Sequence, residues 1–556
     1  MAKKKPVKNV DPTAAASGVP DPLARLIPPP NGVTVRFYRT GHGDCFLLAF
    51  AGKDPKRPAY VLIDCGYKPG SPKFIDTTIK EITASIGAAT GGEIDVAIIT
   101  HEHQDHVNGI TAANFKNIKI AENWLAWTED PRDPLANQLR DQFKDKLLGL
   151  IAARNRLAAA GDDEQAEHLD EFLAFELGGD DEGNPFSIAD AQQLLGAAAK
   201  DPLDSMNKKS MKVFKDLAGG TPKFLKPHDE IYSVPNAAKA RVFVLGPPCQ
   251  TTSLRDLDPQ GSEQFHRLSL SHSSPGNFFA AAAQCNDETA PVRSPFLCRY
   301  HVCKRDACSD REYGAFFTDY YGEESHPPRF ARERNPAISP DATLPLDAEE
   351  IPEGRGPDEI RDNAAWRRID NEWLYSAEQL ALDMNDFTNN ASLVLAFELG
   401  RGGKVLLFAA DAQRGNWVSW AEKEWLDGAE SVSARDLLAR TVLYKVGHHG
   451  SHNATLNGAV EDVYPNLSWM GLKNSGNEFT AMITAVRAWA ETQKGWDHPL
   501  ASIKEALLEK ASGRVFQTDT PFAQMKPAGT GADRDWNDFK SRTREHRLFF
   551  DYEIRE

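Results

Sequence analysis

Residues 98–109, IITHEHQDHVNG, constrain this chain more than any other stretch, because an apolar run leads directly into a cluster of metal-binding side chains. Residues 94–100 have the length and β-branched content of a short buried strand. The pattern H-x-H-x-D-H follows at once, at His101, His103, Asp105 and His106. Residues two apart in an extended loop can converge on one ion, and imidazole and carboxylate groups suit zinc, manganese or iron. The alternative is a polar loop, but only 15 of the 556 residues are histidines, and we predict a metal site.

Strand-like and helix-like stretches alternate around this motif, which is typical of an α/β core. The expected strands lie at 33–50 (two strands around a Gly-rich turn), 59–66, 94–100 and 118–127, with a helix at 74–87. Further along, 391–399 and 404–411 have the pattern of a β-hairpin, and 441–455 that of a strand ending in three more histidines. A helix is expected at 373–384, and a strand pair at 513–519 and 546–554.

These patterns divide the chain into core segments and large insertions. We predict the following organisation: 1–30, a disordered basic and Pro-rich tail; 31–130, the first half of the core; 131–220, a helical insertion; 221–248, core strands; 249–372, an irregular insertion; 373–475, the second half of the core; and 476–556, C-terminal helices and a strand pair packing on the core.

Composition excludes some classes of protein. No apolar run is long enough to span a membrane, and no apolar stretch follows the N-terminal lysines, so a cytoplasmic address without membrane association is expected. A net charge of −16 argues against a protein that tracks duplex DNA, although a local basic groove stays open. The acidic segment 162–182 is expected to be a solvated helix face.

Seven cysteines do not indicate a disulfide framework. Cys298, Cys303 and Cys308 surround His301, but their spacing matches none of the common zinc motifs. Free thiols are the favoured interpretation, and a metal at these four residues is left open.

The H-x-H-x-D-H pattern resembles the signature of the metallo-β-lactamase superfamily, and further motifs of that family follow in the same order. Asp64, which ends VLID, resembles the aspartate that orients the ligand loop from behind. Asp411, which ends VLLFAAD, resembles the aspartate that bridges two metals. VGHHGSHNAT resembles the last ligand motif, where either His448 or His449 could be the ligand and His452 is expected in a substrate pocket or on the surface.

The resemblance extends to the ComEC-like branch of the superfamily. GHGDC at 41–45 is similar to the GQGD turn of that branch, with His42 in the place of the glutamine, and NNASLVL and HHGS are also similar to it. The resemblance covers about 33–128 and 385–475, and the membrane helices of the DNA-uptake version are absent. It implies an αββα four-layer sandwich, here with large helical and irregular insertions, that binds one or two divalent metal ions, with zinc favoured and manganese as the alternative.

One departure concerns the family's third motif, which usually supplies a histidine before the bridging aspartate. Here the corresponding stretch reads TNNASLVL and has none. Asn390 and Ser392 are then expected near the metal, either facing it or supporting its ligands from behind, or water is expected to complete its shell. The occupancy of the two metal positions stays open.

The resemblance implies a hydrolase that uses a metal-bound hydroxide. Phosphodiester substrates are favoured, as in a nuclease or phosphodiesterase, with nucleic acid left open as a partner. Asp105 is expected to bind metal and orient the nucleophile, and His42 either to donate a proton to the leaving oxygen or merely to pack. The alternatives are a hydrolase of small amides, lactones or thioesters, and a non-catalytic metal-binding interaction protein.

Overall fold

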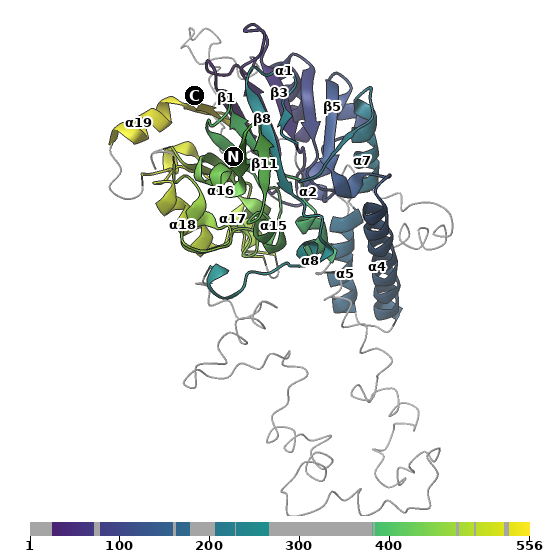
Figure 1. Ribbon diagram of the computed structural model, residues 1–556. Coiled ribbons are helices and arrows are strands. Elements are labelled where there is room, and N and C mark those ends of the chain that lie inside the picture. Colours follow the sequence, from purple (N-terminus) through teal and green to yellow (C-terminus); the bar gives the residue numbers. More distant parts are fainter. Residues whose placement is uncertain are drawn as a thin grey trace, which may run out of the picture. The chain divides into compact units, whose positions relative to one another are not determined.

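The computed structural model describes residues 25–71, 78–159, 163–177, 206–227, 230–265, 381, 384–473, 478–493, 496–527 and 533–556. These residues belong to one compact unit. The fold is a mixed α/β arrangement built on two large sheets (Figure 1). No helix within these ranges is both long and apolar enough to cross a membrane.

The first sheet contains the opening motif. Within the described residues it has eight strands in the order β16-β17-β1-β2-β3-β4-β5-β6. β3, β4, β5 and β6 run parallel, whereas β17, β1, β2 and β3 pair antiparallel. The bounds are β1 Val33–Tyr38, β2 Phe46–Phe50, β3 Ala59–Ile63, β4 Glu93–Ile98, β5 Lys119–Ala126, β6 Lys223–Leu225, β16 Thr543–Glu545 and β17 Phe549–Ile554.

The second sheet has seven strands in the described part of the chain, in the order β15-β14-β13-β10-β9-β8-β7. β10, β13, β14 and β15 run parallel, and β9 pairs antiparallel with both β8 and β10. A separate hairpin is formed by β11 (Glu424–Asp427) and β12 (Glu430–Ser433). The bounds are β7 Tyr232–Ser233, β8 Ala240–Gly246, β9 Val394–Leu399, β10 Val405–Phe408, β13 Thr441–Lys445, β14 Thr480–Ile483 and β15 Val515–Gln517.

The two sheets bury a common core between them. Phe46 of the first sheet meets Phe408 of the second edge-to-face at 5.4 Å, and Phe50 meets Phe397 at 5.8 Å. A second apolar cluster joins the other face of the second sheet to α15, α16 and α18, and a third joins the other face of the first sheet to α1 and α7. This layering is compatible with an α/β sandwich.

Helices cover these outer faces or extend from the strand ends (Figure 1). In the region expected to be a helical insertion, α4, α5 and α7 form, and α4 lies alongside α5 (Figure 1). The bounds are α1 Ile79–Thr90, α2 Gln104–Val107, α3 Ala112–Phe115, α4 Pro134–Ala159, α5 Asp163–Leu177, α7 Met206–Leu217, α8 Thr251–Leu254, α15 Arg414–Ser419, α16 Ala434–Ala439, α17 Arg487–Ala490, α18 Ala501–Lys510 and α19 Asp533–Ser541, with 3-10 turns η1 Trp127–Glu129, η2 Gly261–Glu263, η6 Gly447–Gly450, η7 Leu467–Trp469 and η8 Phe522–Gln524.

Several expectations from the sequence are confirmed at the level of elements. β1 and β2, β3, β4 and β5 form where strands were expected, and β9 and β10 form the expected hairpin. The strand pair expected at 513–519 and 546–554 is wrong: β15 lies in the second sheet, whereas β17 pairs with β1 in the first. The expected tail at 1–30 and the irregular insertion lie almost wholly outside the described residues, as does most of the helix expected at 373–384.

Candidate metal centre

The site forms where strands of both sheets end. β3 leads to Asp64 and β4 to the loop that carries His101 and His103, while β10 leads to Asp411 and β13 to His449. β3 and β4 are parallel neighbours, as are β10 and β13, so each pair delivers its side chains to one edge of its sheet. All these side chains are buried. The carboxyl ends of parallel strands are the usual place for such sites.

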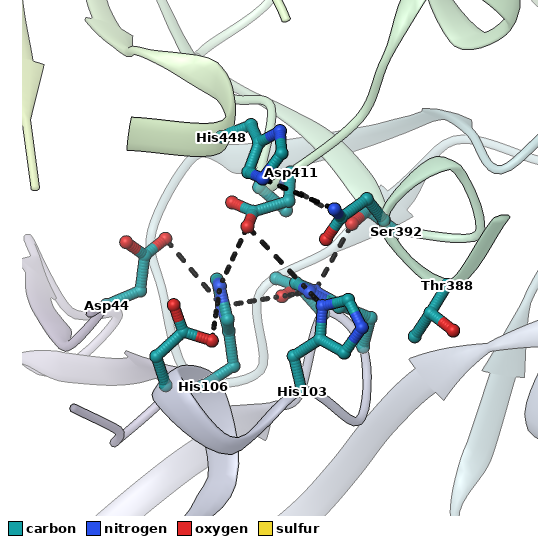
Figure 2. Close-up of polar contacts among 12 residues, drawn as sticks. Asp44, His103, His106, Thr388, Ser392, Asp411 and His448 are labelled. Atoms are coloured by element: carbon teal, nitrogen blue, oxygen red, sulfur yellow. Dashed lines mark hydrogen bonds and ion pairs between the residues drawn. The ribbon is translucent and has the colours of Figure 1, made fainter. Parts of the chain in front are cut away.

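His106 is held from behind by a carboxylate. Its Nδ1 lies 2.9 Å from Asp64 Oδ2, so Nδ1 carries the proton and donates it to that oxygen. Asp64 also accepts from the backbone nitrogen of Thr100 at 2.8 Å and from its hydroxyl at 2.7 Å. Nε2 of His106 is left facing the centre, 3.3 Å from Asp411 Oδ2 (Figure 2).

His101 and His103 turn one nitrogen each toward a common point. His101 Nε2 and His103 Nδ1 lie 3.1 Å apart. His101 Nδ1 contacts the hydroxyl of Ser392 at 3.2 Å, and His103 Nε2 contacts Glu176 Oε1 at 3.1 Å. Two unprotonated nitrogens this close would repel, so the pair either shares a proton or binds a cation between its lone pairs.

His449, rather than His448, enters the cluster. His449 Nδ1 lies 2.9 Å from the carbonyl oxygen of Thr484, and its Nε2 lies 3.0 Å from Asp105 Oδ2 and 3.6 Å from Asp411 Oδ2. His448 instead receives the Asn389 amide at Nε2, at 3.2 Å. Of the two histidines, His449 is therefore the one that contacts the carboxylates of the cluster.

Asp411 lies centrally among the imidazoles. One oxygen, Oδ2, is within 3.3–3.9 Å of facing nitrogens of His101, His106 and His449. The other, Oδ1, is 3.5 Å from the buried ammonium of Lys445. Lys445 also pairs with Asp44 at 2.5 Å. The ammonium thus neutralises part of the carboxylate charge at this end of the cluster.

The backbone is strained where it presents these residues. Of the seven described non-glycine residues with positive φ, four lie at the site: Asp64 (54°), Ala410 (49°), His448 (39°) and His449 (54°). Such conformations cost on the order of 1–3 kcal/mol each and cluster at functional sites. This concentration supports a functional role for the strand ends.

Glycines allow the first-sheet loops to approach each other closely. A Cβ on Gly66 would lie 2.3 Å from the backbone carbon of Asp105, and one on Gly43 (φ +150°) would lie 2.8 Å from the Asp105 oxygen. That approach lets the Asp44 nitrogen donate to the Asp105 oxygen at 3.0 Å. The 41–45 turn therefore fixes the backbone of the ligand loop.

The charge states of the cluster follow from burial and from neighbouring groups. Burial lowers the pKa of His106, but the carboxylates of Asp411, Asp44, Asp64 and Asp105 outweigh this and raise it well above its usual value. For His449 burial also lowers the pKa, and the carboxylates again raise it.

Burial and neighbouring charges also determine the pKa values of Asp411 and His101. Burial acts to raise the pKa of Asp411, but His106, His449 and Lys445 hold it well below its usual value. His101, in contrast, has a pKa well below normal, mainly because it is buried. In the metal-free protein, the neighbouring carboxylates thus favour the protonated, positively charged forms of His106 and His449.

The donor set fits a divalent metal ion. Two overlapping groups have donor atoms within 4.8 Å of one another: Asp44, His106 and His449, and His101, His106 and Asp411. Within the described residues, His106 Nε2 and Asp105 Oδ1 are buried without a hydrogen bond. Buried polar atoms of this kind require a partner, and imidazole and carboxylate donors suit zinc or manganese. These buried clusters could hold a metal ion.

A wall of rings lies beside the centre. The ring of His42 is 4.2 Å from that of His449, and Trp489, Trp496 and His498 lie 5.3–5.5 Å from it. His42 is fully buried, and its Nδ1 makes no hydrogen bond within the described ranges. Burial lowers the pKa of His42 well below its usual value, so its imidazole is neutral.

Ser392 and Asn390, both expected near the metal, differ in where their side chains point. Ser392 lies behind the site, bonding His101 and the Asp411 nitrogen. Asn390 is directed elsewhere: its amide donates to the backbone oxygens of Ser253 and Leu254, and its oxygen accepts from Asn416. His452, with a side chain 40% exposed, approaches only Asp258 among the groups described.

Other contributors were not predicted. Asp44 lies in the quoted GHGDC turn, but only the fold brings it to His106. Lys445 reads as an ordinary residue of a buried strand. Glu176 belongs to the segment expected to be solvated, yet its side chain is 2% exposed. No pattern in the sequence links these residues to the opening motif.

The chain matches no family model, and no curated protein matches its sequence. The three cysteines in the described residues, Cys45, Cys65 and Cys249, are free thiols. Cys298, His301, Cys303 and Cys308 lie outside the described ranges.

Proposed function

We propose that this chain is a metal-dependent hydrolase with a metallo-β-lactamase fold, of the ComEC-like branch, acting on phosphodiesters. The observation that carries the proposal is the arrangement of four histidines. Each of them has one ring nitrogen bonded from behind and the other facing the shared cluster. Metal-binding histidines are held in this way.

The fold supports the same proposal. Two sheets pack face to face with helices on both outer faces, and the cluster lies at strand ends of both sheets. This is the layering that an αββα sandwich requires. Asp64, Asp105, Asp411 and His449, whose motifs resemble those of the family, lie together in this cluster, and this supports the proposal.

A bound divalent ion would supply a Lewis acid that lowers the pKa of water and stabilises charge developing on a phosphoryl group. His101, His103, Asp105, His106, Asp411 and His449 would hold one or two such ions, with zinc favoured over manganese. Ser392, Thr484 and Asp64 orient the imidazoles from behind. Lys445 limits the repulsion between Asp44 and Asp411.

Neutral imidazoles beside the centre can form hydrogen bonds to the oxygens of a phosphodiester. Burial lowers the pKa of His448 to about 4 and that of His498 well below its usual value. A neutral imidazole offers one N–H donor and one acceptor. His42 Nδ1 is available for a hydrogen bond to a leaving or non-bridging oxygen.

The test is turnover of bis-p-nitrophenyl phosphate and single-stranded DNA by the purified chain with Zn²⁺ or Mn²⁺. We expect hydrolysis by wild type, loss in Asp105→Asn, and wild-type rates in His452→Gln, because His452 lies outside the cluster. His42→Asn should keep its metal but slow turnover roughly 10–100-fold, the value of one hydrogen bond to a charged group.

Two outcomes contradict the proposal. Turnover of lactones, amides or thioesters without phosphodiesters would indicate a small-molecule hydrolase. No turnover with either metal, together with equal partner binding by wild type and Asp105→Ala, would indicate an interaction protein.

A further inference from the structure

The helical insertion reaches the candidate metal centre through one carboxylate. Glu176 lies near the end of α5, one residue before Leu177. Its Oε1 is 3.1 Å from Nε2 of His103, and the side chains of both residues are at most 2% exposed. Burying a carboxylate away from water costs free energy unless it is paired and hydrogen-bonded.

The atom that Glu176 contacts decides what it can do. His103 turns its other nitrogen, Nδ1, toward His101 Nε2 at 3.1 Å. An ionised carboxylate is only an acceptor, so its partner Nε2 must carry the proton. With the proton on Nε2, Nδ1 keeps a lone pair directed at the point where His101 also faces. Asp64 acts on His106 in the same way, but there the bonded nitrogen is Nδ1 and the nitrogen that faces the centre is Nε2.

The insertion also holds the ligand loop at a second point. Glu102, between the two histidines, forms an ion pair with Lys208 of α7. Asn207, the preceding residue of α7, donates its amide to the backbone oxygen of Glu176 at 2.9 Å. α5 and α7 are thereby joined to each other beside the loop. α2, the short helix that begins immediately after His103, contacts both α5 and α7.

We propose that Glu176 is a positioning residue of the metal centre, which accepts the Nε2 proton of His103 and fixes Nδ1 as the metal-facing nitrogen. This rests on the metal centre of the proposed function, and it assigns to the helical insertion a part in metal binding. This contact would also compensate for the histidine that is missing from the third motif of this chain. The position with fewer protein ligands retains a histidine whose ring is oriented by a buried carboxylate.

The experiment measures Co²⁺ and Zn²⁺ affinity by chelator competition in full-length wild type, Glu176→Leu, Glu176→Gln and the control Glu167→Gln. Glu167 lies on the same helix and is exposed. Glu176→Leu removes the acceptor at similar volume, whereas Glu176→Gln keeps an acceptor oxygen without the charge. The visible spectrum of bound Co²⁺ reports the ligand geometry, and thermal unfolding of the metal-free proteins reports folding.

We expect Glu176→Leu to weaken metal binding about 10–100-fold and to alter the Co²⁺ spectrum, as loss of such a partner does elsewhere. Glu176→Gln should weaken it several-fold, because a neutral acceptor bonds an imidazole less strongly than a carboxylate. Glu167→Gln should match wild type. Should Glu176→Leu fail to fold, Glu176→Gln carries the test.

Wild-type affinity and an unchanged spectrum in the folded Glu176 variants would overturn the inference and leave the proposed function standing. A wild-type protein that binds neither metal would overturn both. A lower unfolding temperature without a change in affinity would show that Glu176 only packs the insertion against the core.

Discussion

At the scale of single residues, metal binding would replace the positive charge of protonated imidazoles with that of the metal ion. The raised pKa values of His106 and His449 favour protonated imidazoles in the absence of metal. A metal ion needs their lone pairs, so it must displace those protons. Protons and metal ions therefore compete for the same imidazole nitrogens, which buried carboxylates surround.

This competition predicts proton release. Binding of Zn²⁺ should release protons from His106 and His449, and affinity should fall as the pH decreases. Calorimetry in buffers of different ionisation enthalpy measures the number released. Release of no protons, or an affinity that rises on acidification, would contradict the charge states given above.

A second residue-scale prediction concerns Asp64, whose φ of 54° limits what can replace it. Asparagine tolerates the left-handed region and keeps the shape, so Asp64→Asn should fold. It should weaken metal binding about 10–100-fold, because the carboxylate that accepts from His106 Nδ1 is lost. Chelator competition against the exposed control Asp54→Asn measures the effect; equal affinities would show that Asp64 serves only as a turn residue.

Some residues of the centre could be predicted from the sequence, and others could not. His101, His103, Asp105 and His106 were readable because they form one short motif, and Asp411 because it follows a strand. The choice between His448 and His449 needed the structure. Asn390 was expected near the metal because it lies in the stretch that corresponds to the third motif, but its side chain joins the backbone near α8 to α15. Lys445 and Glu176 were missed because their roles depend on tertiary contacts that no local pattern encodes.

At the scale of elements, the sequence pattern identifies the last strand, β17, but not the strand with which it pairs. Residues 549–554 read correctly as a strand, but the partner of β17 is β1, more than 500 positions away. The pairing is reinforced by a two-pronged contact in which Arg36 donates to both oxygens of Asp551, at 2.7 and 2.8 Å. Alternation identifies a strand, whereas its neighbours are chosen by packing.

The strand should accordingly be part of the cooperative core. Phe550 is fully buried, and its ring lies 5.3 Å from that of Phe516 in the opposite sheet. Phe550→Ala should lower the free energy of unfolding by about 3–5 kcal/mol through the cavity it leaves. Denaturant unfolding tests this against Leu426→Ala, whose side chain is 79% exposed and should change stability by less than about 0.5 kcal/mol. Similar values for both variants would mean that β17 only lies against the core.

At the scale of the whole molecule, the two sheets are joined by packing and by the site. The core between the sheets buries aromatic residues of both, and the cluster draws ligands from loops that follow strands of each sheet. A metal ion would add a further link between them. The α/β class was predictable from the alternation of strands and helices, whereas the use of α5 in the site was not.

The central claim is that the buried histidines and aspartates form a metal centre. Elemental analysis of the purified chain, reconstituted with Zn²⁺ and freed of excess ion, tests it most directly. Both candidate ligand groups include His106, so His106→Gln is the matched variant. We predict one or two zinc ions per wild-type chain and a clear loss in the folded variant; equal metal content in the two proteins would contradict the account.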